Sequence, residues 1–126
     1  MNLRNALSIH LASLQAGHAD FEDTMALVER YFDYQPTAFD NGPLHNAAGQ
    51  NEGSCKLFAM AQQAGLTEDE ALKCFGRHYQ SVLDDPAGDS HGNIRQFMST
   101  GWSGIRFAGS PLHQKTQHAP SQEESL

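Results

Sequence analysis

The stretch NEGSCKLFAMAQQAGLTEDEALKCFGRHYQSVL, residues 51–83, decides the fold because it carries two successive helix signals. Its first half passes from a polar loop into an apolar stretch with helical spacing. Asn51 or Ser54 can cap this helix, and Gly65 ends it, since glycine readily adopts the left-handed conformation that follows a last helical turn. The residues expected on its core face are Leu57, Phe58 and Ala61.

The second half of this stretch contains the clearest helix start in the chain. Thr67 and Glu70 have the spacing of a capping box, in which the hydroxyl accepts from one free amide and the carboxylate accepts from another. An apolar stripe follows at helical spacing, made of Leu72, Phe75, Tyr79, Val82 and Leu83. We expect one helix here, closed by the Asp-Asp-Pro sequence at residues 84–86.

Three more helices are predicted on either side of this centre. An N-terminal helix has Asn2 as cap and Gly17 as stop, and a second helix begins at Asp20. A last helix is capped by Asp89 or Ser90 and ends at Gly101. The apolar stripes of these helices are Leu3, Leu7, Leu11 and Leu14; Phe21, Met25, Val28 and Phe32; and Ile94, Phe97 and Met98.

Two short segments look extended rather than helical. Aromatic residues surround Pro36 in the segment 34–40, and the sequence WSGIRF at 102–107 partly alternates between apolar and polar residues. If they pair, they make a small two-stranded β element. We therefore expect a mainly α, α+β single domain with about five short helices: an amphipathic helix in residues 1–19, a globular part in 20–112 packed with it, and a disordered tail in 113–126.

Composition narrows the classes of function. The 126 residues include 15 Asp and Glu against 8 Lys and Arg, which gives a net charge of −7. Such a surface repels phosphate backbones, so nucleic acid is not an expected partner. No apolar run approaches the length of a membrane span. Oligomeric state does not follow from the sequence.

Cys55 is a residue with several chemical interpretations. It lies in the first turn of a predicted helix, where free amides favour the thiolate form. A nucleophilic role would require a histidine and an orienting group, and His91 with Asp89 or Asn93 could supply them. The alternative, which we favour, is a small buried residue that packs. Enzyme activity is therefore not the expected function.

A metal ion or cofactor is not predicted. Cys74 and His78 lie four residues apart on one predicted helix and could reach one ion, but a structural zinc site requires a second close pair of ligands. The chain also contains no phosphate-binding loop, dinucleotide fingerprint or nucleophile elbow. We expect no metal site and no bound cofactor.

Two loop-to-helix junctions share an unusual composition rich in Asn, His and Gly. They span residues 41–56 and 89–95, and both end in helix N-termini that can present free amides. If the junctions converge, they form a polar pocket for a small ligand; otherwise these residues simply satisfy tight connections. The candidate binding residues are Asn41, His45, Asn46, Asn51, Ser54, Asn93 and Arg95.

These junctions also carry a family resemblance. The segments PTAFDNG, NEGSCKLFAMA, LTEDEALKCFGRHYQSVLDDPAG, HGNIRQFMSTGWSGIRF and PLHQ, in this order, resemble the HopJ type III effector family from about Phe21 to Leu112. The resemblance implies export from the bacterial cytoplasm into a host cell by a type III secretion system. It carries no active-site residue over to this chain. The first 19 residues contain no Asp or Glu, which fits an uncleaved N-terminal export signal.

We therefore expect a secreted effector or effector-like protein that binds a host protein and engages the type III secretion machinery. One alternative is a cysteine-dependent hydrolase or transferase that uses Cys55 and His91. The other is a small-ligand binding protein whose pocket lies between the two polar junctions.

Overall fold

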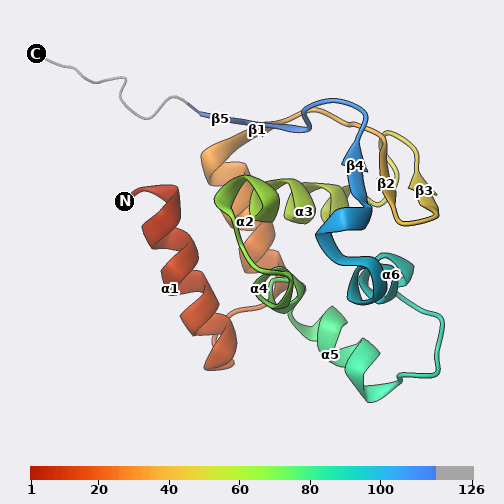
Figure 1. Ribbon diagram of the computed structural model, residues 1–126. Coiled ribbons are helices and arrows are strands. Elements are labelled where there is room, and N and C mark those ends of the chain that lie inside the picture. The colour runs from red at the N-terminus through yellow and green to blue at the C-terminus, as the bar shows by residue number, and fades with distance from the viewer. Residues whose placement is uncertain (116–126) are drawn as a thin grey trace, which may run out of the picture.

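The computed structural model describes residues 1–115 and has the predicted α+β architecture in a single domain (Figure 1). Within these residues there are six α-helices, one 3-10 helix and five short strands. The helices are α1 (Leu3–Gln15), α2 (Phe21–Tyr31), α3 (Glu52–Ala64), α4 (Glu68–Lys73), α5 (Arg77–Asp84), α6 (Gly92–Thr100) and the 3-10 helix η1 (Gly101–Gly104). The strands are β1 (Phe32–Tyr34), β2 (Phe39–Asn41), β3 (Leu44–Asn46), β4 (Ile105–Phe107) and β5 (Leu112–Gln114).

Helix α3 forms the centre of the domain because it is apolar around most of its circumference. The predicted core residues Leu57, Phe58 and Ala61 are buried in one hydrophobic cluster. Ala59 and Met60 belong to a second cluster, which includes residues of α1, α2 and β5. A helix that contributes to two clusters is covered by neighbours on both sides, which explains why its buried residues outnumber the predicted ones.

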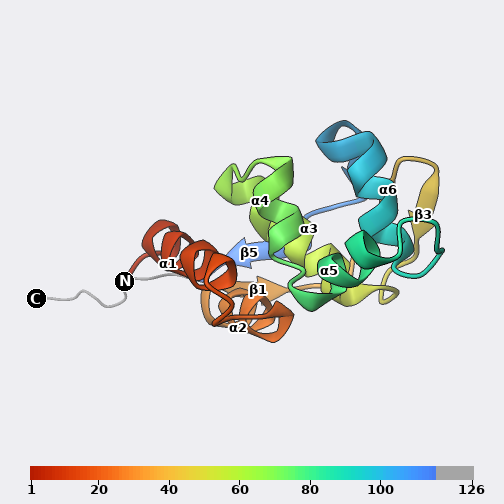
Figure 2. The ribbon, with the colours of Figure 1, turned by 90° about the horizontal axis from the view of Figure 1, so that it is seen from below.

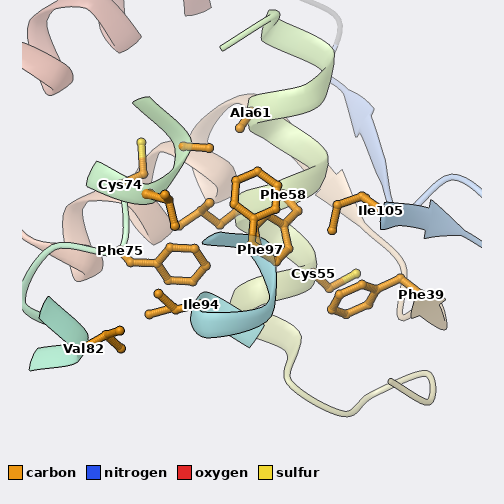
Figure 3. Close-up of a cluster of buried hydrophobic side chains, with 13 residues drawn as sticks. Phe39, Cys55, Phe58, Ala61, Cys74, Phe75, Val82, Ile94, Phe97 and Ile105 are labelled. Carbon is orange, nitrogen blue, oxygen red and sulfur yellow. The ribbon is translucent and has the colours of Figure 1, made fainter. Parts of the chain in front are cut away.

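Aromatic side chains fill the larger cluster. Figure 3 shows Phe58 at its centre, facing Phe97 with their ring centroids 4.8 Å apart. Phe75 lies 5.5 Å from Phe58 in an edge-to-face arrangement, and Phe39 lies 6.2 Å from it. Such tilted and edge-on contacts stabilise the core beyond the burial of area alone.

The N-terminal helical hairpin confirms the predicted caps. Asn2 Oδ1 accepts a hydrogen bond from the Asn5 amide, and Asp20 forms a capping box with Asp23 at the start of α2. One buried polar contact joins the hairpin to the core. His10 Nε2 donates to Thr24 Oγ1 at 2.6 Å, because the Thr24 hydroxyl itself donates to the Cys74 carbonyl at 2.8 Å.

This contact predicts a pH dependence of stability. Burial lowers the pKa of His10 below its ordinary 6.5, an effect that nearby Asp23 partly offsets. Because the folded protein favours neutral His10, its contribution to stability is present above pH 6.5 and is lost as the pH falls below that value. We expect the free energy of unfolding, measured by urea titration between pH 7 and pH 5, to fall more steeply in the wild type than in His10→Gln.

His18→Gln is the matched control, since His18 is exposed in the loop after α1. The pKa of His78 is also lowered, so His78 adds to the loss of stability at low pH in the wild type and in both variants. The effect of His10 is therefore the difference in slope between His10→Gln and the wild type. Equal slopes in the wild type and in His10→Gln would contradict the prediction.

The predicted single helix from Thr67 to Asp84 is wrong, because Gly76 divides it into α4 and α5. Gly76 has φ +58° and ψ −128°, and a Cβ there would meet Asp20 Oδ1 and lie 2.7 Å from the Phe21 amide nitrogen. Because Gly76 has no side chain, Asp20 can approach the start of α5. Asp20 Oδ1 there accepts hydrogen bonds from two amides, those of Phe21 at 2.8 Å and Arg77 at 2.9 Å. These bonds, with the Arg77 guanidinium, lower the pKa of Asp20 to about 2.

The predicted pairing of the segments 34–40 and 102–107 is confirmed, with Phe39 opposite Phe107 in the antiparallel pair β2–β4. The sheet is larger than expected, since β3 adds a third strand in the order β3-β2-β4, and β1 and β5 form a second antiparallel pair. Strand β5 includes His113 and Gln114, so the predicted disordered tail begins too early; its remainder from residue 116 lies outside the described residues. No helix within residues 1–115 is long and apolar enough to span a membrane.

Candidate functional site

The two polar junctions lie on one cleft of about 440 Å³. The N-terminal end of α6 lies beside β3 in both views of the molecule (Figures 1 and 2), and His78 of α5 lines the same cleft. The polar side chains that line the cleft are His45, Asn46, Gln50, Asn51, Ser54, His78, His91 and Asn93. Its apolar lining comes from Phe21, Leu44, Phe75 and Ile94.

A cluster of buried amides forms the floor of the cleft. Asn46 and Asn93 are joined reciprocally: Asn46 Nδ2 donates to Asn93 Oδ1 at 3.2 Å, and Asn93 Nδ2 donates to Asn46 Oδ1 at 2.9 Å. Asn41 Nδ2 donates to Asn93, and Asn51 Nδ2 donates to Asn46 at 2.7 Å. This cluster fixes β3 against α6, 47 residues further along the chain.

Asn41 carries an unusual feature of the same cluster. Its side chain is fully buried, yet its Oδ1 is the buried side-chain polar atom without a hydrogen-bond partner among residues 1–115. The predicted binding residue Asn41 is therefore part of the floor rather than of the cleft surface.

Both helices that start at the cleft have left-handed N-caps. Asn51 precedes α3 with φ +52°, and His91 precedes α6 with φ +55°. Neither side chain makes a capping hydrogen bond. For α3, Asn51 holds the predicted N-cap position but does not cap the helix through its side chain, and Ser54 lies inside the helix. For α6, the predicted caps Asp89 and Ser90 are wrong, because His91 holds the N-cap position. The first turns of both helices line the cleft and direct the positive ends of their dipoles toward it.

The charge of the cleft differs from that of the whole chain. Among the described residues that line it there are three histidines and no Asp, Glu, Lys or Arg. The pKa of His78 is lowered mainly by burial, and also by the charges of Arg77 and His91. The cleft thus offers hydrogen-bonding groups next to two helix N-termini.

Histidines form two further contacts at the cleft. The rings of His78 and His91 lie with their centroids 5.1 Å apart, tilted by 43°. His45 Nδ1 lies 2.7 Å from Asp40 Oδ1 across the β2–β3 hairpin.

Cys55, His91 and Asp89 are not brought together. Cys55 is 1% exposed and packs beside Phe39 (Figure 3), and its Sγ donates to the Thr37 carbonyl at 3.7 Å. Burial, and then Glu52, raise the pKa of the Cys55 thiol to about 11. His91 instead contacts His78, and Asp89 is exposed. This geometry provides no activated thiol.

The buried thiols predict low reactivity in the native protein. A thiol-specific reagent at pH 8 should label Cys55 and Cys74 far more slowly in folded than in denatured protein, since the thiolate is the reactive form and burial disfavours it. The measurement is the rate of labelling at pH 6 and pH 8, with the denatured chain as the reference. Fast labelling of either thiol at both pH values would contradict the prediction.

Two other candidates are placed away from the cleft. Arg95 donates to the carbonyls of Ser90 and Pro86 and helps to shape the loop before α6. Cys74, the partner considered for His78, is fully buried, and burial raises its pKa to about 12. His78 instead faces His91.

Sequence reasoning missed Phe21, Gln50 and the role of His78 in the cleft. Phe21 comes from α2, and no local pattern indicates that it reaches this site. One signal was present: Gly53 lies in the first turn of α3, where glycine is unfavourable unless space demands it. A Cβ on Gly53 would lie 2.8 Å from Phe21 Cζ.

The fold and the cleft define a small α+β protein with a preformed polar cleft. A family model described as HopJ type III effector protein matches residues 7–112. The chain belongs to the HopJ type III effector family, and this match covers all the elements that line the cleft.

A solved structure shares the fold. It is described as the crystal structure of unknown function protein VPA0580, and it aligns with a TM-score of 0.84 and 43% sequence identity. The alignment covers 91% of this chain and 95% of that chain. No curated protein gives a significant match.

Proposed function

We propose that the protein is a type III secreted effector that acts in the host cell by binding a host protein, and that the cleft between β3, α5 and α6 is its recognition site. Family membership supports the effector role. The observation that carries the binding role is the convergence of the two polar junctions on one cleft. No catalytic group is required by this function.

The Asn floor is the feature that suits the cleft to recognition. Asn46 and Asn93 hold the walls together before any partner arrives. A preformed site loses less conformational entropy on binding, so more of the contact energy is available as affinity. Side chains above this floor, such as Gln50, Ser54 and His91, can then hydrogen-bond a partner.

Export is tested with a translocation reporter fused to residues 1–50. The fusion should enter host cells only when the secretion apparatus is intact. A fusion that starts at residue 20 is the control, since it lacks the acid-free segment but keeps α2. Failure of the 1–50 fusion to enter would remove the export claim.

Recognition is tested by photo-crosslinking from two positions of the full chain. A photoreactive residue replaces Gln50 at the cleft rim in one variant, and Met98, which is 45% exposed away from the cleft, in the other. We expect a discrete host-protein adduct from position 50 and none from position 98. An adduct from position 98 alone would place recognition on another face.

The cleft volume favours a second candidate, a small polar ligand. About 440 Å³ lies in the range of small-molecule sites. Native mass spectrometry of protein purified from its own bacterium would show such a ligand as a fixed added mass, absent from a Ser54→Trp variant that fills the cleft. A single unmodified mass in gentle conditions would remove this candidate.

A further inference from the structure

We propose that His78 and His91 form a binding site for a divalent transition-metal ion of the zinc type at the cleft. His78 comes from α5, and His91 is the N-cap of α6. Both side chains line the cleft, so a bound metal would add an open coordination position to the proposed recognition site. Metal binding itself does not depend on export or on a host partner.

The spacing of the two rings fits shared coordination. Two imidazoles bound to one ion, with metal–nitrogen distances of about 2.1 Å and a roughly tetrahedral angle, have their centroids about 5 Å apart. The centroids of His78 and His91 lie 5.1 Å apart. Their tilt of 43° is compatible with this arrangement because the ligand planes of a tetrahedral site are free to differ.

Both rings have nitrogens available for a metal. Across residues 1–115, no hydrogen bond to a protein group involves a ring nitrogen of His78 or His91. A metal binds the neutral imidazole, whose unprotonated ring nitrogen offers a lone pair. The availability of both rings therefore needs no rearrangement of hydrogen bonds.

The surroundings hold the pair in place. His78 lies edge-on to Phe21 with ring centroids 5.1 Å apart, and Phe21 stacks on Phe75 in the core. The backbone of His91 is fixed at φ +55°, a conformation that few residues adopt. Ligands fixed before binding favour the metal complex.

The nearby charges act in both directions. Arg77, which adjoins His78, and the N-terminal end of α6 at His91 both disfavour a cation. Glu22 and Asp20 favour one, but both are already paired with Arg77, whose Nη1 lies 2.6 Å from Glu22 and 3.2 Å from Asp20. The proposal therefore rests on the two imidazole ligands and not on negative charge around them.

The site would be open rather than closed. In the described part of the chain, no group of three or more His, Cys, Asp or Glu side chains is placed to hold one ion. Two protein ligands therefore leave the remaining positions to water or to a donor atom of whatever occupies the cleft. Imidazole ligands favour Zn²⁺, Ni²⁺ and Cu²⁺ over Mg²⁺ and Ca²⁺.

The test uses the untagged, metal-free full chain. Zn²⁺ is titrated by calorimetry, and Ni²⁺ is added to ¹⁵N-labelled protein so that paramagnetic broadening locates the ion. We expect one ion per chain, broadening centred on His78, His91 and Gly92, and no effect of Mg²⁺. His78→Gln and His91→Asn should each weaken Zn²⁺ binding by roughly tenfold or more.

The variants are matched to keep the fold. Asn tolerates the left-handed conformation required at position 91, as Asn51 does at the start of α3. His113→Gln is the control, since His113 is exposed on β5 and does not line the cleft. Circular dichroism of each variant checks that it is folded.

Three results would overturn the proposal: no stoichiometric Zn²⁺ binding, binding unchanged in both His78→Gln and His91→Asn, or binding weakened as strongly by His113→Gln. These outcomes are independent of the export and cross-linking results. Loss of metal binding with retained cross-linking from position 50 would reject the metal site alone.

Discussion

Phe58→Ala should lower the free energy of unfolding by about 3 to 5 kcal/mol, the largest effect expected for a single substitution in this chain. Phe58 is 0% exposed, and its ring contacts four other aromatic rings. The substitution removes this apolar area and leaves a cavity at the centre of the core, which the surrounding helices cannot fill by rotamer changes alone. Urea unfolding followed by circular dichroism measures the change.

Leu83→Ala is the matched control for Phe58→Ala. Leu83 is also a large apolar residue on a helix, but it is 45% exposed. Its replacement should change the free energy of unfolding by well under half as much. Similar losses for the two variants would show that the aromatic cluster is not the centre of stability.

Asn46→Ala should lower the free energy of unfolding by about 3 kcal/mol, because it leaves buried polar groups without partners. Asn46 Oδ1 accepts from Asn93 and Asn51, and its Nδ2 donates to Asn93. Its loss deprives the buried Asn93 amide of its acceptor and cuts the link between β3 and α6. Urea unfolding measures the loss of stability. Amide hydrogen exchange in residues 44–54 should also become faster than in the wild type.

Gln50→Ala is the control for Asn46→Ala. Gln50 lies in the loop that follows β3, but it is exposed, and its side chain accepts one hydrogen bond, from the Ala47 amide. It should cost less than 1 kcal/mol, as exposed hydrogen bonds usually do. If Asn46→Ala costs no more than Gln50→Ala, the amide cluster does not fix the cleft.

The helices of this fold follow from local sequence signals. Asn2, Asp20 and Thr67 start their helices as predicted, because a cap and its partner lie within one helical turn. The core face of α3 likewise follows from apolar spacing. Both kinds of signal depend only on residues a few positions apart.

The features that sequence did not reveal depend on distant partners. The break at Gly76 exists because the Arg77 amide finds its partner in Asp20, 57 residues before Arg77 in the chain, and not in a continuing helix. The five strands have only three residues each, too few for an alternating pattern to be distinguished from a loop. The sequence does not show whether the two polar junctions meet in one pocket. Their convergence depends on the tertiary contact between Asn46 and Asn93, which are 47 residues apart in the chain.

The shared cap at Asp20 has a consequence for the order in which the protein folds. One carboxylate oxygen serves the first turns of both α2 and α5, so α5 lacks its cap until the N-terminal hairpin has docked. Closing a contact across 57 residues costs chain entropy that only later contacts recover. We therefore expect α5, and with it the position of His78 at the cleft, to become ordered late, after the hairpin and α3 have assembled.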